Sequence, residues 1–341
     1  MRISRSEFVR LAAAGAVGLV GGCRDLADDV SRKEGGLAKA GTDAGPAFDD
    51  NFTIVFSDAH VCGAPNRAAR FTPKRLERFV AEVLAMRPMP RRVVHLGDLA
   101  LYYGLPEDYA VSVPMLKRLE QAGIELVFCM GNHDRRSAFA EAWPGVLEKS
   151  PVPGRFVSVT SLGTADLVVL DGLQGKDDRP EKDMGPVSGQ LDAGQIAWLE
   201  RELPTRTRPF LVASHFPIKE LKLSLEGKTV DLGYWLLKCA PKCIGYLYGH
   251  MHYWSPLWMR RSWSSRKTLR TLCMPSLGLW GDIGYVTLRT SADRAVCRLE
   301  MNDFFFPAEP EDPNFRPAPW EIKVEETNGQ TCTFLYDREG V

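Results

Sequence analysis

Five of the six histidines in the chain directly follow short apolar runs that are typical of buried strands. They are His60, His133, His215, His250 and His252. Three oxygen-bearing side chains occur in the same segments, namely Asp58, Asp98 and Asn132. Imidazole, carboxylate and amide groups without a thiolate form a ligand set that suits Zn, Fe, Mn or Mg. The residue types alone therefore predict a metal site built from several loops.

The elements that must position these side chains are short strands separated by helices. Predicted strands cover 52–56, 92–96, 125–130, 156–159, 166–171, 210–214 and 243–249, and predicted helices cover 72–86, 106–122 and 192–203. This pattern indicates an α/β fold, in which ligand crevices lie beyond the carboxyl ends of the strands. Side chains far apart in sequence are therefore expected to share one site. The sixth histidine, His95, lies within a strand and is interpreted as a core residue.

The sequence around Asp98 gives a further reason to expect a metal site. Apolar residues precede and follow it in VVHLGDLALYYG, so its carboxylate is expected to be buried. A buried charge without a partner is very costly, which favours a cationic partner over a simple turn.

Composition narrows the function classes. The chain has 341 residues, with 43 basic and 43 acidic side chains and therefore no net charge. A nucleic-acid-binding protein usually carries a basic excess, so no nucleic-acid binding is expected.

The first 23 residues have the basic start, short apolar stretch and small residues of an export signal. VGGC within them resembles a bacterial lipobox, in which Cys23 would be lipidated and attached to a membrane; the alternative is a plain signal peptide. Residues 24–50 are expected to be a flexible linker. The expected location is the periplasm or the cell surface. The remaining organisation is a domain at 51–305, then a Pro-rich connector and a β-hairpin around Asn328-Gly329 at 306–341.

The ordered motifs resemble those of the calcineurin-like metallophosphoesterases. They are D58-A-H60, G97-D98, G131-N132-H133-D134, H215 and G249-H250-M251-H252, within a match from Phe52 to Leu299. Connecting segments such as LDAGQIAWLEREL are similar to the class III cyclic-nucleotide phosphodiesterase branch. The resemblance implies a four-layer αββα sandwich, with two mixed β-sheets flanked by helices.

The resemblance also implies roles for the motif residues. One metal ion would be held by Asp58, His60, Asp98 and His252, and the other by Asp98, Asn132, His215 and His250. Asp98 would bridge the two divalent or trivalent ions. The implied reaction is hydrolysis of a small phosphomonoester or phosphodiester by metal-activated hydroxide. His133 would protonate the leaving group or bind phosphate.

One position departs from the pattern of many relatives. They carry an acidic residue three positions after the bridging aspartate, where it pairs with the catalytic histidine, and this chain has Leu101 there. His133 would then depend on another group such as Asp134, or contribute less. Leu101 keeps open a second hypothesis, a surface lipoprotein that binds metal or a phosphorylated ligand without turnover.

Further side chains have two interpretations each. Phe216, Tyr253, Trp254 and Trp280 would line a substrate pocket or belong to ordinary aromatic packing. Arg135 would hold a phosphate or remain exposed to solvent.

Overall fold

The computed structural model describes residues 47–66, 69–175, 188–225, 227–260, 268–301 and 328–337, and the structural statements below concern these residues. The chain divides into two compact units, 1–44 and 45–341, and all described residues belong to the second. The expected export signal, most of the expected linker and the Pro-rich connector at 306–319 lie outside the described residues.

The first sheet has six strands and mixed pairing. Its order is β14 (Thr331–Leu335), β13 (Arg294–Glu300), β12 (Tyr285–Thr290), β1 (Phe48–Phe56), β2 (Met89–Leu96) and β3 (Glu125–Cys129). The strands β1, β2 and β3 are parallel, whereas β12, β13 and β14 pair antiparallel. The carboxyl ends of the three parallel strands therefore meet at one edge of the sheet.

The second sheet also has six strands and mixed pairing. Its order is β10 (Ser255–Arg260), β11 (Thr268–Cys273), β9 (Cys243–Tyr248), β6 (Phe210–Ser214), β5 (Asp166–Val169) and β4 (Ser158–Ser161). The four central strands are parallel and the two edge strands are antiparallel to their neighbours. A separate hairpin joins β7 (Lys222–Leu225) to β8 (Lys228–Asp231).

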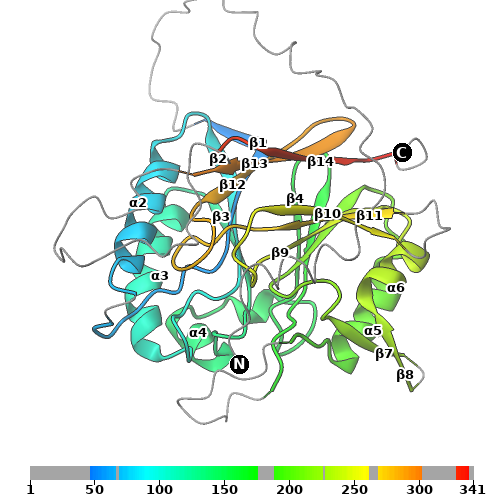
Figure 1. Ribbon diagram of the computed structural model, residues 1–341, viewed down its shortest axis with the longest axis horizontal. Coiled ribbons are helices and arrows are strands. Elements are labelled where there is room, and N and C mark those ends of the chain that lie inside the picture. The colour runs from blue at the N-terminus through cyan, green and yellow to red at the C-terminus, as the bar shows by residue number, and fades with distance from the viewer. Residues whose placement is uncertain are drawn as a thin grey trace, which may run out of the picture. The chain divides into compact units, whose positions relative to one another are not determined.

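Helices cover the outer face of each sheet (Figure 1). The first sheet is covered by α2 (Thr72–Ala85), α3 (Pro106–Gln121) and α4 (Arg136–Ala142), and the second by α5 (Ala193–Glu202) and α6 (Leu232–Cys239). A short 3-10 helix spans Leu147–Lys149. The inner faces of the two sheets share a third apolar core, which contains Val55, Val94, Leu211 and Leu247. The predicted four-layer αββα sandwich is therefore confirmed.

Local sequence explains where the helices begin. Pro73 occupies the first turn of α2, where a missing N–H costs nothing, and apolar residues then recur at helical spacing on its buried face. Asp192 caps α5, because its side chain accepts the backbone N–H of Gln195 at 2.8 Å. The helix α3 continues through Pro114.

Most strand predictions differ from the structure at one end. β1 begins at Phe48 rather than 52 and β2 at Met89 rather than 92, whereas β3, β5 and β9 end one or two residues earlier than predicted. β4 covers Ser158–Ser161 rather than 156–159. Residues 156 and 157 lie before β4 because the N–H of Phe156 bonds to the side chain of Asp171 at 3.0 Å instead of to a neighbouring strand. The segment after Asn328-Gly329 forms β14 and pairs with β13, while the first half of the expected hairpin lies outside the described residues.

Two observations concern the environment of the chain. Among the described residues, no helix is long and apolar enough to cross a membrane. The cysteines in this part of the chain, which are Cys62, Cys129, Cys239, Cys243, Cys273, Cys297 and Cys332, are all free thiols.

Candidate metal centre

The structure brings together the loops that follow five parallel strands. Asp58 and His60 follow β1, and Asp98 follows β2. The remaining residues follow β3, β6 and β9, and they are Asn132, His133, His215, His250 and His252. All eight residues singled out in the sequence therefore lie at the carboxyl edges of the two sheets.

One cluster joins the loops after β1 and β9. Asp58, His60 and His252 are buried, and each offers a ligand atom within 4.8 Å of the other two. The Nε2 atom of His252 lies 3.0 Å from Oδ1 of Asp58, and the Nε2 atoms of His60 and His252 are 3.3 Å apart. Two imidazole nitrogens and one carboxylate oxygen thus converge on one point.

A second cluster joins the loops after β2, β3, β6 and β9. The Nε2 atom of His215 lies 3.1 Å from Oδ2 of Asp98 and 3.3 Å from Oδ1 of Asn132. The Nδ1 atom of His250 lies 2.9 Å from the same oxygen of Asn132 and 3.2 Å from Nε2 of His215. This cluster therefore presents two nitrogen atoms and two oxygen atoms.

Asp98 lies between the two clusters. Its Oδ2 atom is 3.1 Å from Nε2 of His215 in the second cluster and 3.9 Å from Nε2 of His60 in the first. Its Oδ1 atom accepts the backbone N–H of His133 at 2.8 Å, which fixes the rotation of the carboxylate. One carboxylate is thus placed to serve both groups of ligand atoms.

Backbone carbonyls orient the ligand histidines. The Nδ1 atom of His60 bonds to the carbonyl of Leu101 at 3.0 Å, and that of His215 bonds to the carbonyl of Leu96 at 2.8 Å. An Nδ1–H that donates to a carbonyl leaves the lone pair on Nε2, which is the tautomer that a metal ligand needs. In both residues this Nε2 faces the carboxylates.

The electrostatics of the clusters suit bound cations. Burial lowers the pKa of His60 to about 3 and that of His250 to about 4, so both rings are neutral ligands. Burial acts against the charge of Asp98, but the neighbouring imidazoles of His215 and His133 lower its pKa well below the usual value. Burial also opposes protonation of His215, yet the Asp98 carboxylate raises its pKa to about 9. The carboxylates of Asp58 and Asp98 are therefore ionised and fully buried, close to the neutral imidazoles of His60 and His250, and this buried negative charge fits a pair of cations.

The backbone of the site is strained. Asp58, His60, Asp98, His250 and His252 have φ between +46° and +67°, a region that non-glycine residues rarely adopt. Each such residue costs on the order of 1–3 kcal/mol, and such strain concentrates at functional sites. Bonds between the loops hold the conformation, since the N–H of Asp58 donates to the carbonyl of Gly97 at 2.9 Å and that of His60 to the carbonyl of Asp98 at 3.0 Å.

Asp134 holds the Asp98 loop in place, a role that the sequence did not predict. Its two oxygens accept the backbone N–H groups of Asp98, Leu99, Ala100 and Gly131 and the hydroxyl of Tyr109, at 2.8–3.2 Å. Burial and the nearby charge of Asp98 raise the pKa of Asp134 to about 6, so it is ionised at neutral pH. The only signal in the sequence was its place in the GNHD motif.

His133 is oriented by a carbonyl rather than by a carboxylate. Its Nδ1 atom bonds to the carbonyl of Tyr102 at 3.0 Å, and its Nε2 atom faces Asp98 Oδ2 at 3.9 Å. The side chain of Leu101 is buried in a small apolar cluster with Cys62 and Leu279. Asp134 was the partner suggested by the sequence, but its oxygens are directed to the loop backbone.

The aromatic candidates separate into two groups. Phe216 and Trp254 are buried and belong to apolar cores, so their interpretation as ordinary packing is correct. Tyr253 and Trp280 are exposed over 36% and 37% of their surfaces. His95 is a core residue as predicted, because it is buried, packs on Phe56 with ring centroids 4.7 Å apart, and has its pKa lowered by burial to about 3.

The side chain of Arg135 is not simply exposed to solvent, and its suggested contact with a phosphate stays a prediction. Its side chain is partly buried, and its Nε atom donates to the carbonyl of Tyr103 at 3.3 Å. Its backbone N–H donates to the hydroxyl of Tyr109 at 2.9 Å. These contacts tie it to the loops around His133.

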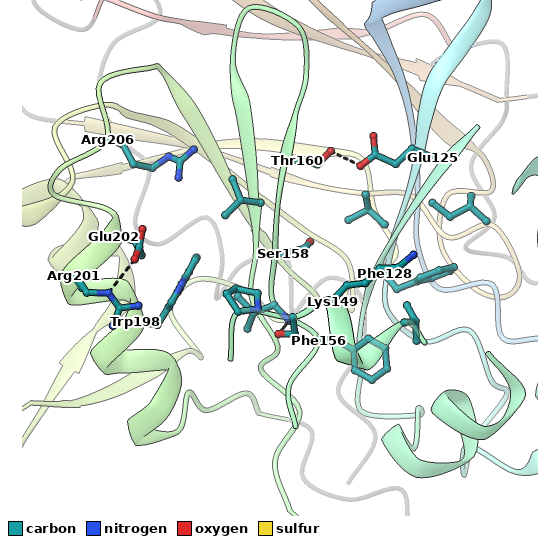
Figure 2. Close-up of a pocket in the computed structure, with 17 residues that line it drawn as sticks. Glu125, Phe128, Lys149, Phe156, Ser158, Thr160, Trp198, Arg201, Glu202 and Arg206 are labelled. Atoms are coloured by element: carbon teal, nitrogen blue, oxygen red, sulfur yellow. Dashed lines mark hydrogen bonds and ion pairs between the residues drawn. The ribbon is translucent and has the colours of Figure 1, made fainter. Parts of the chain in front are cut away.

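A cavity of about 670 Å³ lies away from these clusters. It is bounded by the edge strands β3 and β4 and by α5, and its lining includes Glu125, Phe128, Thr160, Trp198 and Arg206 but no cluster residue (Figure 2). Glu125 is the first residue of β3, whereas the cluster residues follow its other end. We therefore place the candidate site at the two clusters and not in this cavity.

Two adjoining groups of His, Asp and Asn ligands at the edge of an αββα sandwich define the class of a metal-dependent phosphoesterase. Residues 53–254 match the family model described as calcineurin-like phosphoesterase. The chain belongs to this family and is a phosphoric ester hydrolase.

Two similar proteins are named as cyclic nucleotide phosphodiesterases. The chain is 26% identical to a protein named as a probable cyclic nucleotide phosphodiesterase of Rhodopseudomonas palustris, over 83% of this chain and 93% of the relative. It is 29% identical to a cAMP/cGMP dual specificity phosphodiesterase of Mycobacterium tuberculosis, over 60% of this chain and 62% of that relative. The fold is similar to that of a dimetal phosphatase from Danio rerio, with a TM-score of 0.54 and 13% identity over 74% of this chain and 96% of that structure.

Proposed function

We propose that the protein is a dinuclear phosphodiesterase that hydrolyses cyclic nucleotides or similar small phosphodiesters. The observation that carries this proposal is the position of Asp98, whose single carboxylate reaches both clusters of buried ligand atoms. The substrate class is supported by the two cyclic-nucleotide phosphodiesterases to which the chain is similar.

The proposed ligand sets follow the two clusters. Asp58, His60, Asp98 and His252 would hold one ion, and Asp98, Asn132, His215 and His250 would hold the other. The distances support this division: ligand atoms of Asp58, His60 and His252 lie within 4.8 Å of one another, as do those of Asp98, His215 and His250. Asp98 reaches the first set through His60, at 3.9 Å. Asn132 contributes an oxygen without adding a third negative charge to the buried site.

The ions, when bound, supply Lewis acidity toward the phosphate and lower the pKa of water to give a nucleophile near neutral pH. His133 is the proposed general acid. Its side chain is 15% exposed, and the hydrogen bond of Nδ1 to the Tyr102 carbonyl leaves Nε2 facing Asp98. From there it can donate a proton to the departing oxygen.

The hypothesis of binding without turnover rested on Leu101. The structure supplies another orienting group for His133, the carbonyl of Tyr102, so the absence of a carboxylate at position 101 does not favour that hypothesis.

The experiment uses the purified protein, stripped with a chelator and reloaded with Mn²⁺. Initial rates are measured with 3′,5′-cyclic AMP, bis(p-nitrophenyl) phosphate and p-nitrophenyl phosphate. We expect the two diesters to be hydrolysed faster than the monoester. Hydrolysis of the monoester alone would refute the diesterase assignment, and no hydrolysis despite two bound ions would refute the whole proposal.

The bridging role is tested with Asp98→Asn. An amide carries no charge to offset two cations, so this variant is expected to lose bound metal and at least about 100-fold in rate. The matched control is Asp49→Asn, which changes an aspartate near the start of β1 that pairs with Arg289 at 2.8 Å. The proposal is wrong if Asp98→Asn keeps both metal and activity.

We also propose that the first 23 residues export the protein, with Cys23 as the attachment point to a membrane. Composition and order of the segment support this. Expression of the full chain in a bacterium, followed by fractionation, tests it: Cys23→Ala should move the protein from the membrane to the soluble exported fraction. Retention of the wild-type protein in the cytoplasm would contradict export.

A further inference from the structure

Trp280 combines a partly exposed side chain with an unusual backbone conformation. Its side chain is 37% exposed and its φ is +59°. A bulky residue in this backbone region is a clear outlier, and the strain costs on the order of 1–3 kcal/mol. Leaving a large apolar ring in water adds a further cost. A strained, exposed tryptophan beside a reaction centre points to contact with a ligand.

The loop that carries Trp280 is fixed to the metal centre on two sides. The hydroxyl of Ser276 donates to the carbonyl of Asp58 at 2.9 Å, and the N–H of Asp282 donates to the carbonyl of His252 at 2.8 Å. Gly281 passes so close that a Cβ atom there would lie 2.0 Å from the carbonyl oxygen of His252. The indole is therefore positioned by the same residues that form the first cluster.

Trp280 and Tyr102 form a row of aromatic rings beside the clusters. The Trp280 indole stacks on His252 with centroids 5.8 Å apart and planes at 16°, and its edge contacts His60 at 5.4 Å. Tyr102 lies 6.3 Å from Trp280 and 6.0 Å from His133. We call Trp280 and Tyr102 the aromatic wall. It runs from the first cluster to the proposed general acid.

We propose that the aromatic wall binds a planar aromatic group of the ester, a nucleobase or an aryl ring, by stacking on the exposed part of Trp280. This inference rests on the proposed function, because it assumes that the phosphate is held at the clusters. An aromatic group attached to that phosphate through a ribose or directly would reach the neighbouring wall. Stacking of a base on an aromatic side chain tolerates different bases, because every base has a π-face.

The first test measures binding rather than turnover. Dissociation constants of AMP and ribose 5-phosphate, which differ by the base alone, are measured by calorimetry with metal-loaded protein. Trp280→Ala is expected to weaken AMP binding by about 5- to 150-fold, the range for loss of one base–aromatic stack. Ribose 5-phosphate binding should stay within about twofold, because the clusters are retained.

Three variants separate stacking from simple covering of the histidines. Trp280→Phe should keep most of the preference for AMP, whereas Trp280→Leu, which still covers His252, should lose it. Tyr253→Ala is the matched control, because Tyr253 is equally exposed and, in the part of the chain that is described, has no ring contact with the cluster histidines. Equal weakening of both ligands in Trp280→Ala, or retention of the preference in Trp280→Leu, would overturn the inference.

The two proposals fail in different ways. If the protein hydrolyses the diesters but wild type binds AMP no better than ribose 5-phosphate, the aromatic wall is refuted and the phosphodiesterase stands. If no ester is hydrolysed but the preference for AMP disappears in Trp280→Ala, the wall is supported and the diesterase assignment fails. Metal content and thermal unfolding of each variant confirm that the clusters remain intact.

Discussion

Replacement of Asp134 by asparagine tests whether this carboxylate holds the bridging loop. One oxygen of Asp134 accepts the N–H groups of Asp98 and Gly131, and the other accepts those of Leu99 and Ala100 together with the Tyr109 hydroxyl. An asparagine has one oxygen and one NH₂ group. In either orientation, its NH₂ therefore faces at least two backbone donors.

The magnitude follows from those two lost acceptors. Asp134 is fully buried, so no water replaces them. Each buried donor without an acceptor costs about 1–3 kcal/mol, so Asp134→Asn should destabilise the protein by about 2–6 kcal/mol. That is a large share of a typical net stability of about 5–15 kcal/mol. The same change releases the Asp98 loop, so loss of bound metal should accompany it.

The assay is urea unfolding with chelator present, combined with metal analysis of the reloaded protein. Ser112→Ala is the control: its buried hydroxyl makes a hydrogen bond to the carbonyl of Asp108 at 3.0 Å, and its loss should cost only about 0.5–1.5 kcal/mol. If Asp134→Asn unfolds within about 1 kcal/mol of wild type and retains both ions, the assigned role of Asp134 is wrong.

Three further changes test other parts of the structure. In Gly131→Ala the new Cβ would lie 2.1 Å from Oδ1 of Asp98, so the protein should lose bound metal and activity. The control is Gly194→Ala, in which the new Cβ has its nearest neighbour at 3.5 Å, and this variant should keep both in metal analysis and rate assays. Arg136→Ala leaves the carboxylate of Asp171, now bound at 2.7 and 2.9 Å, buried without its cation and should cost about 3–5 kcal/mol in urea unfolding; a loss below about 1 kcal/mol would contradict this. Removal of the metal ions should lower the melting temperature, because a ligand at 100 times its Kd stabilises the folded state by about 2.7 kcal/mol. An unchanged melting temperature after chelation would contradict specific binding of metal to the folded state.

The clustering of the candidate residues could be predicted from the sequence because their placement follows a simple rule. Polar groups that directly follow buried parallel strands must lie at one edge of a sheet. The apolar runs before Asp58, Asp98 and His215 were each long enough to identify a strand, so the positions of these residues followed. The same rule correctly excluded His95 from the candidate site, because His95 lies within its strand rather than after it.

Other features have no local signal. The boundary of β4 was wrong because the side chain of Asp171, fifteen residues further along the chain, binds the N–H of Phe156. The pairing of β14 with β13 joins segments that are separated by a long stretch of chain, and an alternating pattern does not specify such a partner. The positive φ of His60 and His252 depends on bonds between loops, which sequence spacing does not contain.

The departure at Leu101 illustrates this difference. A leucine side chain cannot accept a hydrogen bond, so the sequence indicated that His133 lacks an orienting partner. Residue types do not reveal partners that belong to the backbone. The structure orients His60 and His133 by the carbonyls of residues 101 and 102, which every residue type provides. The side chain at position 101 is thereby free to pack against Cys62 and Leu279. A hydrogen-bond acceptor at Nδ1 fixes the tautomer and orientation of an imidazole, and a backbone carbonyl fulfils this role for both His60 and His133.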